Sequence, residues 1–285
     1  MPDLQLTFFG TAASNAFPEA FCRCANCEAA RAAGGPSLRA RSSALVNDDL
    51  LIDLGPDILT SSFYHRRPLT NVQYCLQTHG HSDHLDPSML LSRSPGYDVI
   101  GAPRLHYYAT PATLARLEGM LQWDFPNGGV MAPGVADELN VTFHLVEPLQ
   151  PFAVGPYRVI AFPANHDRTL DPVLYSIQTA ARTLFYGTDT GVLSEAVWQG
   201  FHTHDLQFDV VILDHTYGPS DPGRDHMNAP QFREHLARFR AEGLLAPNTR
   251  FLATHISHPR NPPHPELAAL AAQHGYEIAY DGLTV

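Results

Sequence analysis

The most informative segment of the chain reads Thr78-His79-Gly80-His81-Ser82-Asp83-His84-Leu85-Asp86. It follows a short apolar run, residues 74–78, that predicts a buried strand. Three histidines and one aspartate therefore fall within six residues of a loop, where closely spaced side chains can converge on one centre. Imidazole and carboxylate are ligands of Zn, Mn and Fe, so the segment predicts a metal site. The alternative, a polar surface loop that contains histidines by chance, fits this spacing poorly.

Further ligand-type residues stand at the ends of other predicted strands. They are His166, Asp189 and His255. Taken singly, a histidine at a strand end is usually solvated, and an aspartate beside threonine and glycine usually marks a turn. Together they supply the additional donors that two metal ions need.

A cluster of cysteines lies near the N-terminus. Cys22, Cys24 and Cys27 fall within six residues, and without an export signal such crowding favours metal over disulfides. Three thiolates need a fourth ligand to close a tetrahedral zinc site. The alternative is three reduced, buried cysteines. Cys75 lies in an apolar strand and is expected in the core.

Length and composition are those of a globular protein. The chain has 285 residues, of which 44% are hydrophobic and 16% charged, and it can bury a full core. It has no run of 18 apolar residues that would predict a membrane span. The first residues lack the basic and apolar regions of a signal peptide, so we expect a soluble cytoplasmic protein.

The charge of the chain bears on its partners. The formal net charge is −11, from 29 acidic and 18 basic residues. Such a surface repels polyphosphates, which argues against nucleic acid as a partner. A small anionic substrate remains compatible, because bound metal cations would dominate the field inside a pocket. A homodimer is compatible with the sequence.

The periodicity of apolar residues predicts strands at both ends of the chain, with helices between and after them. The expected strands are residues 4–9, 42–46, 50–55, 74–78, 157–162, 173–179, 183–187, 209–213, 250–253 and 277–280. The expected helices are residues 110–121, 229–241 and 264–274. This order indicates an α/β fold, an αββα sandwich of two mixed β-sheets flanked by helices. We expect one domain over residues 1–285, with an insertion or lid around residues 103–156, where Pro and Gly are frequent.

The histidine loop and the three later ligands together resemble the metal-binding set of the metallo-β-lactamase superfamily. The likeness follows the order of that family along the whole chain. It implies the metallo-β-lactamase fold and two divalent metal ions, Zn or Mn, at the active site. One ion would be held by His79, His81 and His166, the other by Asp83, His84 and His255, and Asp189 would bridge them.

The cysteine run makes the chain similar to PhnP-type phosphodiesterases of carbon–phosphorus lyase pathways. In that family such a run joins a histidine three residues past the last active-site ligand, and His258 holds this position here. The resemblance therefore implies a structural zinc ion bound by Cys22, Cys24, Cys27 and His258. It also implies a substrate-contacting role for His226, although a lone loop histidine is more often solvated. A glycine-rich loop of the family is replaced here by residues 12–18, so the identity of the substrate does not carry over.

These features predict a dinuclear metal-dependent hydrolase that cleaves small phosphodiesters, cyclic ones included, through a metal-bridging hydroxide. The candidate catalytic residues are Asp83 and His226, the latter as proton donor to the departing alkoxide. One alternative is a lactone or thioester hydrolase of the same fold. Another is a non-catalytic binding or carrier protein like the PqqB group, which shares the cysteine run but lacks an intact histidine loop. We favour catalysis, because this chain keeps every ligand position.

Overall fold

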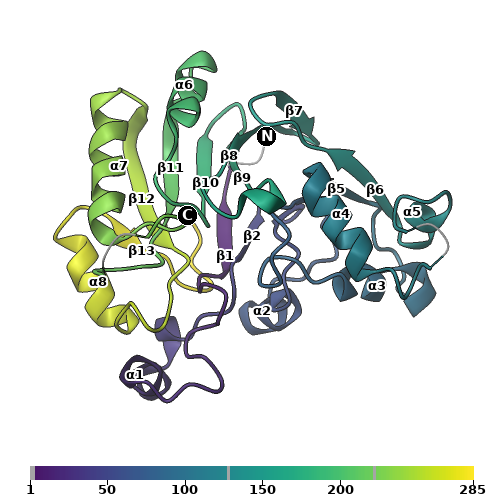
Figure 1. Cartoon of the computed structure of the whole chain (residues 1–285), viewed down its shortest axis with the longest axis horizontal. Helices are drawn as coiled ribbons and strands as arrows, with labels where there is room; N and C mark the ends of the chain where they lie inside the picture. The colour runs from purple at the N-terminus through teal and green to yellow at the C-terminus, as the bar shows by residue number, and fades with distance from the viewer. Residues whose placement is uncertain (1–3, 127–128, 221–222) are drawn as a thin grey trace.

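Two β-sheets face each other across an apolar interior and carry helices on their outer surfaces (Figure 1). The computed structural model describes residues 4–126, 129–220 and 223–285. The layers of helix, sheet, sheet and helix confirm the predicted αββα sandwich.

The first sheet is mixed. Its strands follow the order β1 (Leu6–Gly10), β2 (Ser43–Val46), β3 (Leu50–Ile52), β4 (Tyr74–Leu76), β5 (Leu105–Ala109) and β6 (Val141–Leu145). The first three strands pair antiparallel, and β3 to β6 pair parallel. The predicted hairpin between β2 and β3 turns at Asn47, whose backbone is left-handed with φ of 47°, a conformation that Asn tolerates better than most residues.

The second sheet is also mixed. Its strands follow the order β13 (Glu277–Ile278), β12 (Leu245–Thr254), β11 (Phe208–Asp214), β10 (Thr183–Gly187), β9 (Val173–Gln178), β8 (Tyr157–Pro163) and β7 (Pro151–Val154). The strands from β10 to β13 pair parallel, and those from β7 to β10 pair antiparallel. The interior strand β11 is mostly apolar and almost wholly buried, as expected for a strand covered on both faces.

Helices cover both outer faces. The first sheet carries α2 (Ile58–His65), α3 (Ser88–Ser92), α4 (Pro111–Met120) and α5 (Val135–Glu138). The second sheet carries α6 (Glu195–Thr203), α7 (Ala229–Ala241) and α8 (His264–Ala272), and α1 (Ala25–Ala33) packs beside them. Within the described residues no helix is both long and apolar enough to cross a bilayer.

Two of the helices predicted from the sequence, α4 and α7, begin at side-chain caps. The Thr110 hydroxyl accepts a hydrogen bond from the Thr113 N–H at 3.5 Å, and Pro111 opens α4. At α7, the Asn228 side chain accepts from the Gln231 N–H at 3.0 Å, and the Gln231 side chain accepts from the Asn228 N–H at 3.1 Å. This reciprocal capping satisfies two backbone donors that the helix cannot satisfy itself, and it fixes the loop before α7.

The sequence analysis missed three strands, all between residues 103 and 156. Strands β5 and β6 complete the first sheet, and β7 forms the edge of the second. In β5 both faces are largely covered, so this strand shows no clear period of two. The prediction that residues 103–156 form an insertion or lid stays a prediction.

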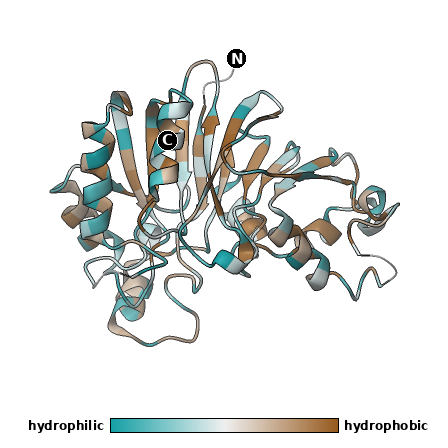
Figure 2. Cartoon of the chain, turned by 45° about the horizontal axis from the view of Figure 1, so that its top comes forward, coloured by the Kyte–Doolittle hydropathy of each residue, from teal (hydrophilic) through white to brown (hydrophobic). Residues whose placement is uncertain are grey.

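The hydrophobic side chains form three clusters. One fills the space between the sheets, and one lies under the helices of each outer face. Figure 2 shows hydrophobic residues along the strands and polar residues on the outward sides of the helices. The cluster under α6 and α7 is aromatic: the ring centroid of Phe201 lies 5.0 Å from those of Phe162 and Phe185 and 5.1 Å from that of Phe208.

We expect Phe201→Ala to lower the free energy of unfolding by about 3–5 kcal/mol, because it opens a cavity in this fully buried cluster. The measurement is urea unfolding followed by circular dichroism. The matched control is Phe63→Ala, since Phe63 is 81% exposed and its loss should change stability by no more than about 0.5 kcal/mol. Equal effects of the two variants would contradict the described core.

Candidate metal centre

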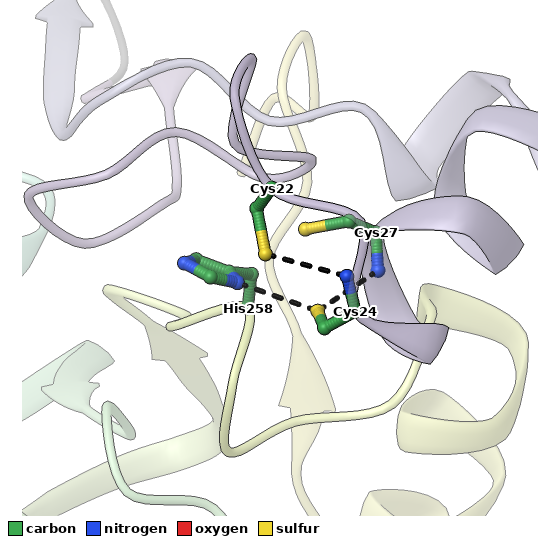
Figure 3. A group of neighbouring side chains, drawn as sticks. All are labelled: Cys22, Cys24, Cys27 and His258. Carbon is green, nitrogen blue, oxygen red and sulfur yellow. Dashed lines mark hydrogen bonds between the residues drawn. The ribbon is translucent and has the colours of Figure 1, made fainter.

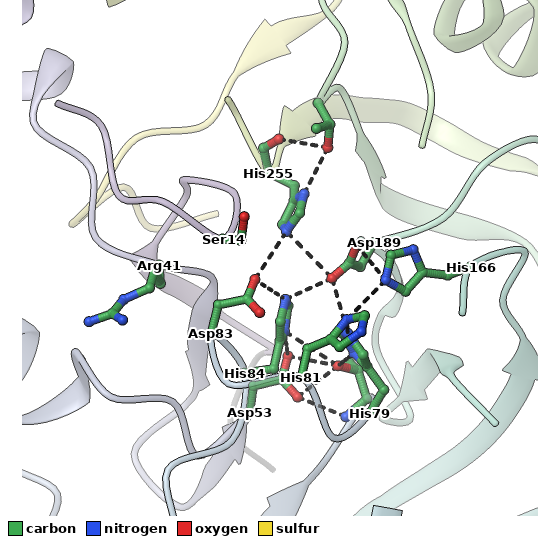
Figure 4. Close-up of polar contacts among 12 residues, drawn as sticks. Ser14, Arg41, Asp53, His79, His81, Asp83, His84, His166, Asp189 and His255 are labelled. Carbon is green, nitrogen blue, oxygen red and sulfur yellow. Dashed lines mark hydrogen bonds and ion pairs between the residues drawn. The ribbon is translucent and has the colours of Figure 1, made fainter. Parts of the chain in front are cut away.

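The predicted ligands meet at one edge of the sandwich. His79 follows β4 of the first sheet, and Asp189 and His255 follow β10 and β12 of the second. His166 comes from the loop after β8. Because the carboxyl ends of these strands lie together, side chains distant in sequence point toward one another (Figure 4).

The seven side chains form two groups that share one member. In each group the ligand atoms all lie within 4.8 Å of one another. The first group is His79, His81, His166 and Asp189, and the second is Asp83, His84, Asp189 and His255. The structure thus brings together every active-site ligand predicted from the sequence, in the two sets that the resemblance implied.

Asp189 stands at the centre of both groups. Its Oδ2 lies 2.8 Å from His84 Nε2, 3.3 Å from His79 Nε2 and 3.5 Å from His255 Nε2. Its Oδ1 lies 3.5 Å from His166 Nε2. Two carboxylate oxygens that face different imidazoles are the geometry of a bridging ligand.

Several polar atoms at this centre are buried and have no hydrogen-bond partner. They are His84 Nε2, His255 Nε2 and Asp189 Oδ1. An unsatisfied buried polar atom costs about 1–3 kcal/mol, so three of them on converging side chains require an explanation. Divalent cations bound among them would supply the missing partners, and the nitrogen and oxygen donors fit Zn or Mn.

Neighbouring side chains hold the imidazoles in place. His84 Nδ1 donates to Asp53 Oδ2 at 2.6 Å, and Thr216 Oγ1 lies 2.7 Å from His255 Nδ1. Thr78 Oγ1 lies 3.0 Å from His79 Nδ1. These contacts occupy the outer nitrogen of each ring and leave Nε2 directed at the centre, as in metal sites generally.

Burial tunes the charges of the centre. It lowers the pKa of His79 to about 4, which keeps this imidazole neutral near pH 7, the form that binds metal. Burial also raises the pKa of Asp189, but His255 and His79 outweigh it, so this pKa lies well below its ordinary value. A neutral imidazole and an ionised carboxylate are therefore available together.

Three residues of the site have left-handed backbones. The φ angles are 64° at Asp53, 58° at Asp189 and 59° at His255. For residues other than glycine such conformations cost about 1–3 kcal/mol each and gather at functional sites. Asp53 and His255 directly follow the ends of β3 and β12, and Asp189 comes two residues after the end of β10, so each turn aims its side chain at the centre.

His226 lies beside the centre without belonging to the seven ligands. Its Nδ1 is 3.0 Å from Asp214 Oδ2, and Asp214 Oδ1 also accepts from the Met227 N–H at 3.1 Å. Burial lowers the pKa of His226, but the Asp214 carboxylate raises it to a net value of about 9. With Nδ1 held by Asp214, Nε2 is the nitrogen left for a substrate.

The centre opens into a cavity of about 440 Å³. Asp83, His226 and several ligands line it, together with residues that the sequence analysis did not single out as functional: Ser14, Asn15, Tyr217, Asp225 and Arg260. The sequence analysis also missed Asp53 and Asp214 as supporting carboxylates. Their only signal was that each ends an apolar run, Leu50-Leu51-Ile52-Asp53 and Val210-Val211-Ile212-Leu213-Asp214.

The cysteine cluster forms a second compact set of donors (Figure 3). The ligand atoms of Cys22, Cys24, Cys27 and His258 lie within 4.8 Å of one another. Cys24 caps α1, and His258 Nδ1 at 3.6 Å lowers the pKa of the Cys24 thiol to about 6. Burial raises the pKa of Cys27 to about 12. A zinc ion would favour all three thiolates and offset their mutual repulsion. Cys75 is buried in the core, as expected.

Comparison with known proteins bears on the family and the fold of the chain. Residues 49–256 match the family model of the beta-lactamase superfamily domain. Coenzyme PQQ synthesis protein B of Pseudomonas putida (strain W619) is 24% identical, with 99% of each chain covered. The structure of a diphosphatase from the PhnP family has a TM-score of 0.75 at 22% identity, covering 99% of this chain and 96% of that chain. Zn²⁺-bound PqqB from Methylobacterium extorquens has a TM-score of 0.73 at 21% identity, covering 99% of both.

The family model covers well over half of the chain, and the chain therefore belongs to the beta-lactamase superfamily. This confirms the resemblance found in the sequence. The two solved structures support the fold.

We expect Asp189→Ala to lose at least one of two active-site metal ions, because the variant removes the carboxylate shared by both groups of ligands. The measurement is elemental analysis of protein loaded with Zn or Mn and freed of excess ion. The control is Asp124→Ala, which removes an exposed carboxylate and should leave the metal content unchanged. Full metal content in a folded Asp189→Ala protein would contradict a dinuclear centre.

We also expect Cys24→Ser to lose one zinc ion while the two active-site ions remain. The cysteine cluster shares no ligand with the active-site groups, so the two sites should empty independently. The matched control is Cys75→Ala, which removes a buried thiol elsewhere in the core. Unchanged zinc stoichiometry in Cys24→Ser would mean that the cluster is a set of buried thiols.

Proposed function

We propose that this protein is a dinuclear metal-dependent hydrolase of small phosphodiesters. One observation carries the proposal: seven ligand-type side chains converge in two groups around one carboxylate at a cavity of about 440 Å³. A cavity of this size accommodates a small molecule. Membership in the beta-lactamase superfamily supports metal-dependent hydrolysis, and the fold shared with a PhnP-family diphosphatase supports a phosphate ester as the substrate class.

The residues divide into two metal sites. One ion would bind His79, His81 and His166, the other would bind Asp83, His84 and His255, and Asp189 would join both. Two divalent ions in these positions supply the chemistry of the class, since they lower the pKa of water and offset the charge of a phosphodiester. Zn and Mn both suit these donors.

The remaining roles fall to side chains of the cavity. His226 is held through Nδ1 by Asp214, so its Nε2 can donate a proton to the departing alkoxide. Asp83 lines the same cavity, and its carboxylate can accept a hydrogen bond from the attacking water in addition to holding an ion. These two residues are therefore the proposed catalytic pair beside the metal ligands.

The cysteine cluster has a supporting role in this proposal. Cys22, Cys24, Cys27 and His258 would bind a structural zinc ion, closed by four protein ligands. Since His258 lies three residues after His255, such an ion would tie the N-terminal segment to the loop that carries an active-site ligand.

A second candidate is a non-catalytic binding or carrier function. It is favoured by the relatives named coenzyme PQQ synthesis protein B, which match this chain over almost its whole length. Against it stands the complete set of seven ligands with a cavity above them. Hydrolysis of a lactone or thioester by the same centre is a third candidate, because activated water also attacks carbonyl carbon.

One panel of assays separates these candidates. Protein of known metal content is incubated with bis(p-nitrophenyl) phosphate, cyclic nucleotides, a ribosyl cyclic phosphate and lactones. We expect turnover of one or more phosphodiesters, abolished by a chelator and restored by the metal. Turnover of lactones alone would favour the third candidate, and no turnover of any substrate would favour the carrier.

The partners follow from the same features. A small anionic substrate would be attracted to a cavity that holds two divalent cations. The net charge of −11 disfavours binding of nucleic acid, because both carry negative charge. We propose no membrane partner for this protein. A homodimer is compatible with the proposed function.

We expect His226→Ala to keep its metal content but to lose about 10²–10⁴-fold in kcat on phosphodiesters with an alkoxide leaving group. The loss should be smaller for bis(p-nitrophenyl) phosphate, because p-nitrophenolate departs without a proton. Steady-state kinetics on both substrates, with elemental analysis, provide the measurement.

The control for this variant is His274→Ala, since His274 is exposed in the turn after α8 and should be dispensable. Equal losses on both substrates would indicate that His226 binds the phosphate. No loss on either substrate would mean that His226 takes no part in catalysis.

A further inference from the structure

A second cavity lies on the outer face of the first sheet. It is a groove of about 630 Å³ lined by residues of α2, of α3 and of the loop of residues 99–103. Helices α2 and α3 cover this face of the sheet (Figure 1). The groove shares no lining residue with the cavity above the metal centre. It is therefore a separate candidate for ligand binding.

The lining of the groove is mostly apolar. Leu51 of β3 and Leu105 of β5 belong to it and are each 1% exposed, so the groove reaches down to the sheet. Two other lining residues are large, apolar and open to solvent: Phe63 is 81% exposed and Ile100 is 97% exposed. An apolar ligand in the groove would remove part of this surface from water, which is favourable.

Two cationic side chains interrupt the apolar lining. Among the described residues that line the groove, Arg66 and Arg93 are the only charged ones, in a chain of net charge −11. Neither guanidinium lies within 4.0 Å of a carboxylate of the described residues, whereas the neighbouring Arg67 lies 3.6 Å from Asp48. The groove thus combines an apolar surface with two positive charges that no nearby carboxylate neutralises.

Arg93 is fixed in position by neutral groups. Its Nη1 donates to the Asn140 carbonyl at 3.1 Å, and its Nη2 donates to the Pro103 carbonyl. Its Nε has no acceptor among the described residues. Burial lowers the pKa of Arg93, but an arginine in a protein stays charged. An anion in the groove would compensate this charge.

Arg66 is anchored at its backbone and free at its end. It terminates α2 in a left-handed conformation with φ of 54°, and its N–H donates to the Phe63 carbonyl at 3.3 Å. Its side chain is exposed and makes no hydrogen bond to the part of the protein that the structure describes. The guanidinium can therefore turn toward an anion in the groove.

We infer that this groove binds an aliphatic carboxylate, with the alkyl chain on the apolar lining and the carboxylate at Arg66 and Arg93. Guanidinium groups bind carboxylate oxygens through charge-assisted hydrogen bonds. A second copy of the chain is the competing occupant. A twofold interface centred on this groove would bring the same unpaired arginines together from both copies, and such like charges repel. The inference is independent of the proposed hydrolase function.

Octanoate and 1-octanol test the inference, because they share the alkyl chain and differ in the charge of the head group. Calorimetry on the metal-loaded protein should show binding of octanoate at least about tenfold tighter than that of 1-octanol. Arg66→Gln should weaken octanoate binding about tenfold and leave 1-octanol within about twofold. Phe63→Ala should weaken both ligands by the same factor, since it removes an apolar contact only. Equal affinities of the wild-type protein for the two ligands would overturn the inference.

Two controls address charge and chain length. Arg158→Gln removes an exposed arginine from β8, so it changes the net charge as Arg66→Gln does and should leave octanoate binding unchanged. An equal loss in both variants would mean that general electrostatic attraction, and not the groove, holds the ligand. Butanoate should bind at least about tenfold more weakly than octanoate, because each buried methylene contributes about threefold to fourfold in affinity. Equal binding of the two acids would also overturn the inference.

Two further measurements exclude other modes of binding. Octanoate affinity should persist after a chelator removes the active-site metal from protein whose circular dichroism spectrum is unchanged. Loss of affinity together with the metal would place octanoate on the active-site ions and overturn the inference. Sedimentation equilibrium gives the oligomeric state of the wild-type protein and of Phe63→Ala. A dimer that Phe63→Ala dissociates, with no binding of octanoate, would assign the groove to a second copy.

Discussion

The whole site depends on a carboxylate, that of Asp189, buried among five imidazoles. The side chain is 3% exposed, and an ionised carboxylate removed from water needs strong compensation. Oδ2 is approached by His79, His84 and His255. Oδ1 is approached by His166 and His226. These histidines follow strands of both sheets. The carboxylate of Asp189 therefore contacts side chains from both halves of the sandwich at their common edge.

The imidazoles can stabilise the buried Asp189 carboxylate because neighbouring side chains already hold them in place. Asp53 is fully buried and receives the N–H groups of Gln77, Thr78 and His84. Asp214 does the same on the other side for His226 and for the backbone of the loop before α7. Two supporting carboxylates thus orient imidazoles on opposite sides of Asp189. Such preorganisation is the condition for electrostatic catalysis, since no reorientation is then needed during the reaction.

Site residues could be predicted from the sequence where they lie close to one another along the chain. The loop from His79 to His84 was visible because its ligands are close in the chain. Asp53 and Asp214 were not, because one acid at a strand end resembles any turn, and only the folded contacts reveal its role. Tyr217 and Arg260 lie on loops without periodicity, so their approach to the cavity follows from tertiary packing. The fold was predictable from the apolar strands, except where both faces of β5 are largely covered.

The active-site ligands and the cysteine cluster are connected through one backbone segment, residues 255–258. Ile256 lies between His255 and His258, and its backbone exchanges hydrogen bonds with Thr11 and Ala13 of the N-terminal segment. That segment then supplies residues 14–15 to the cavity wall and the cysteines to the second cluster. His255 of the active-site ligands and His258 of the cysteine cluster thus lie at opposite ends of the same four residues, 255–258. Both histidines also line the cavity, so an ion bound at either cluster would restrain the same segment of its wall.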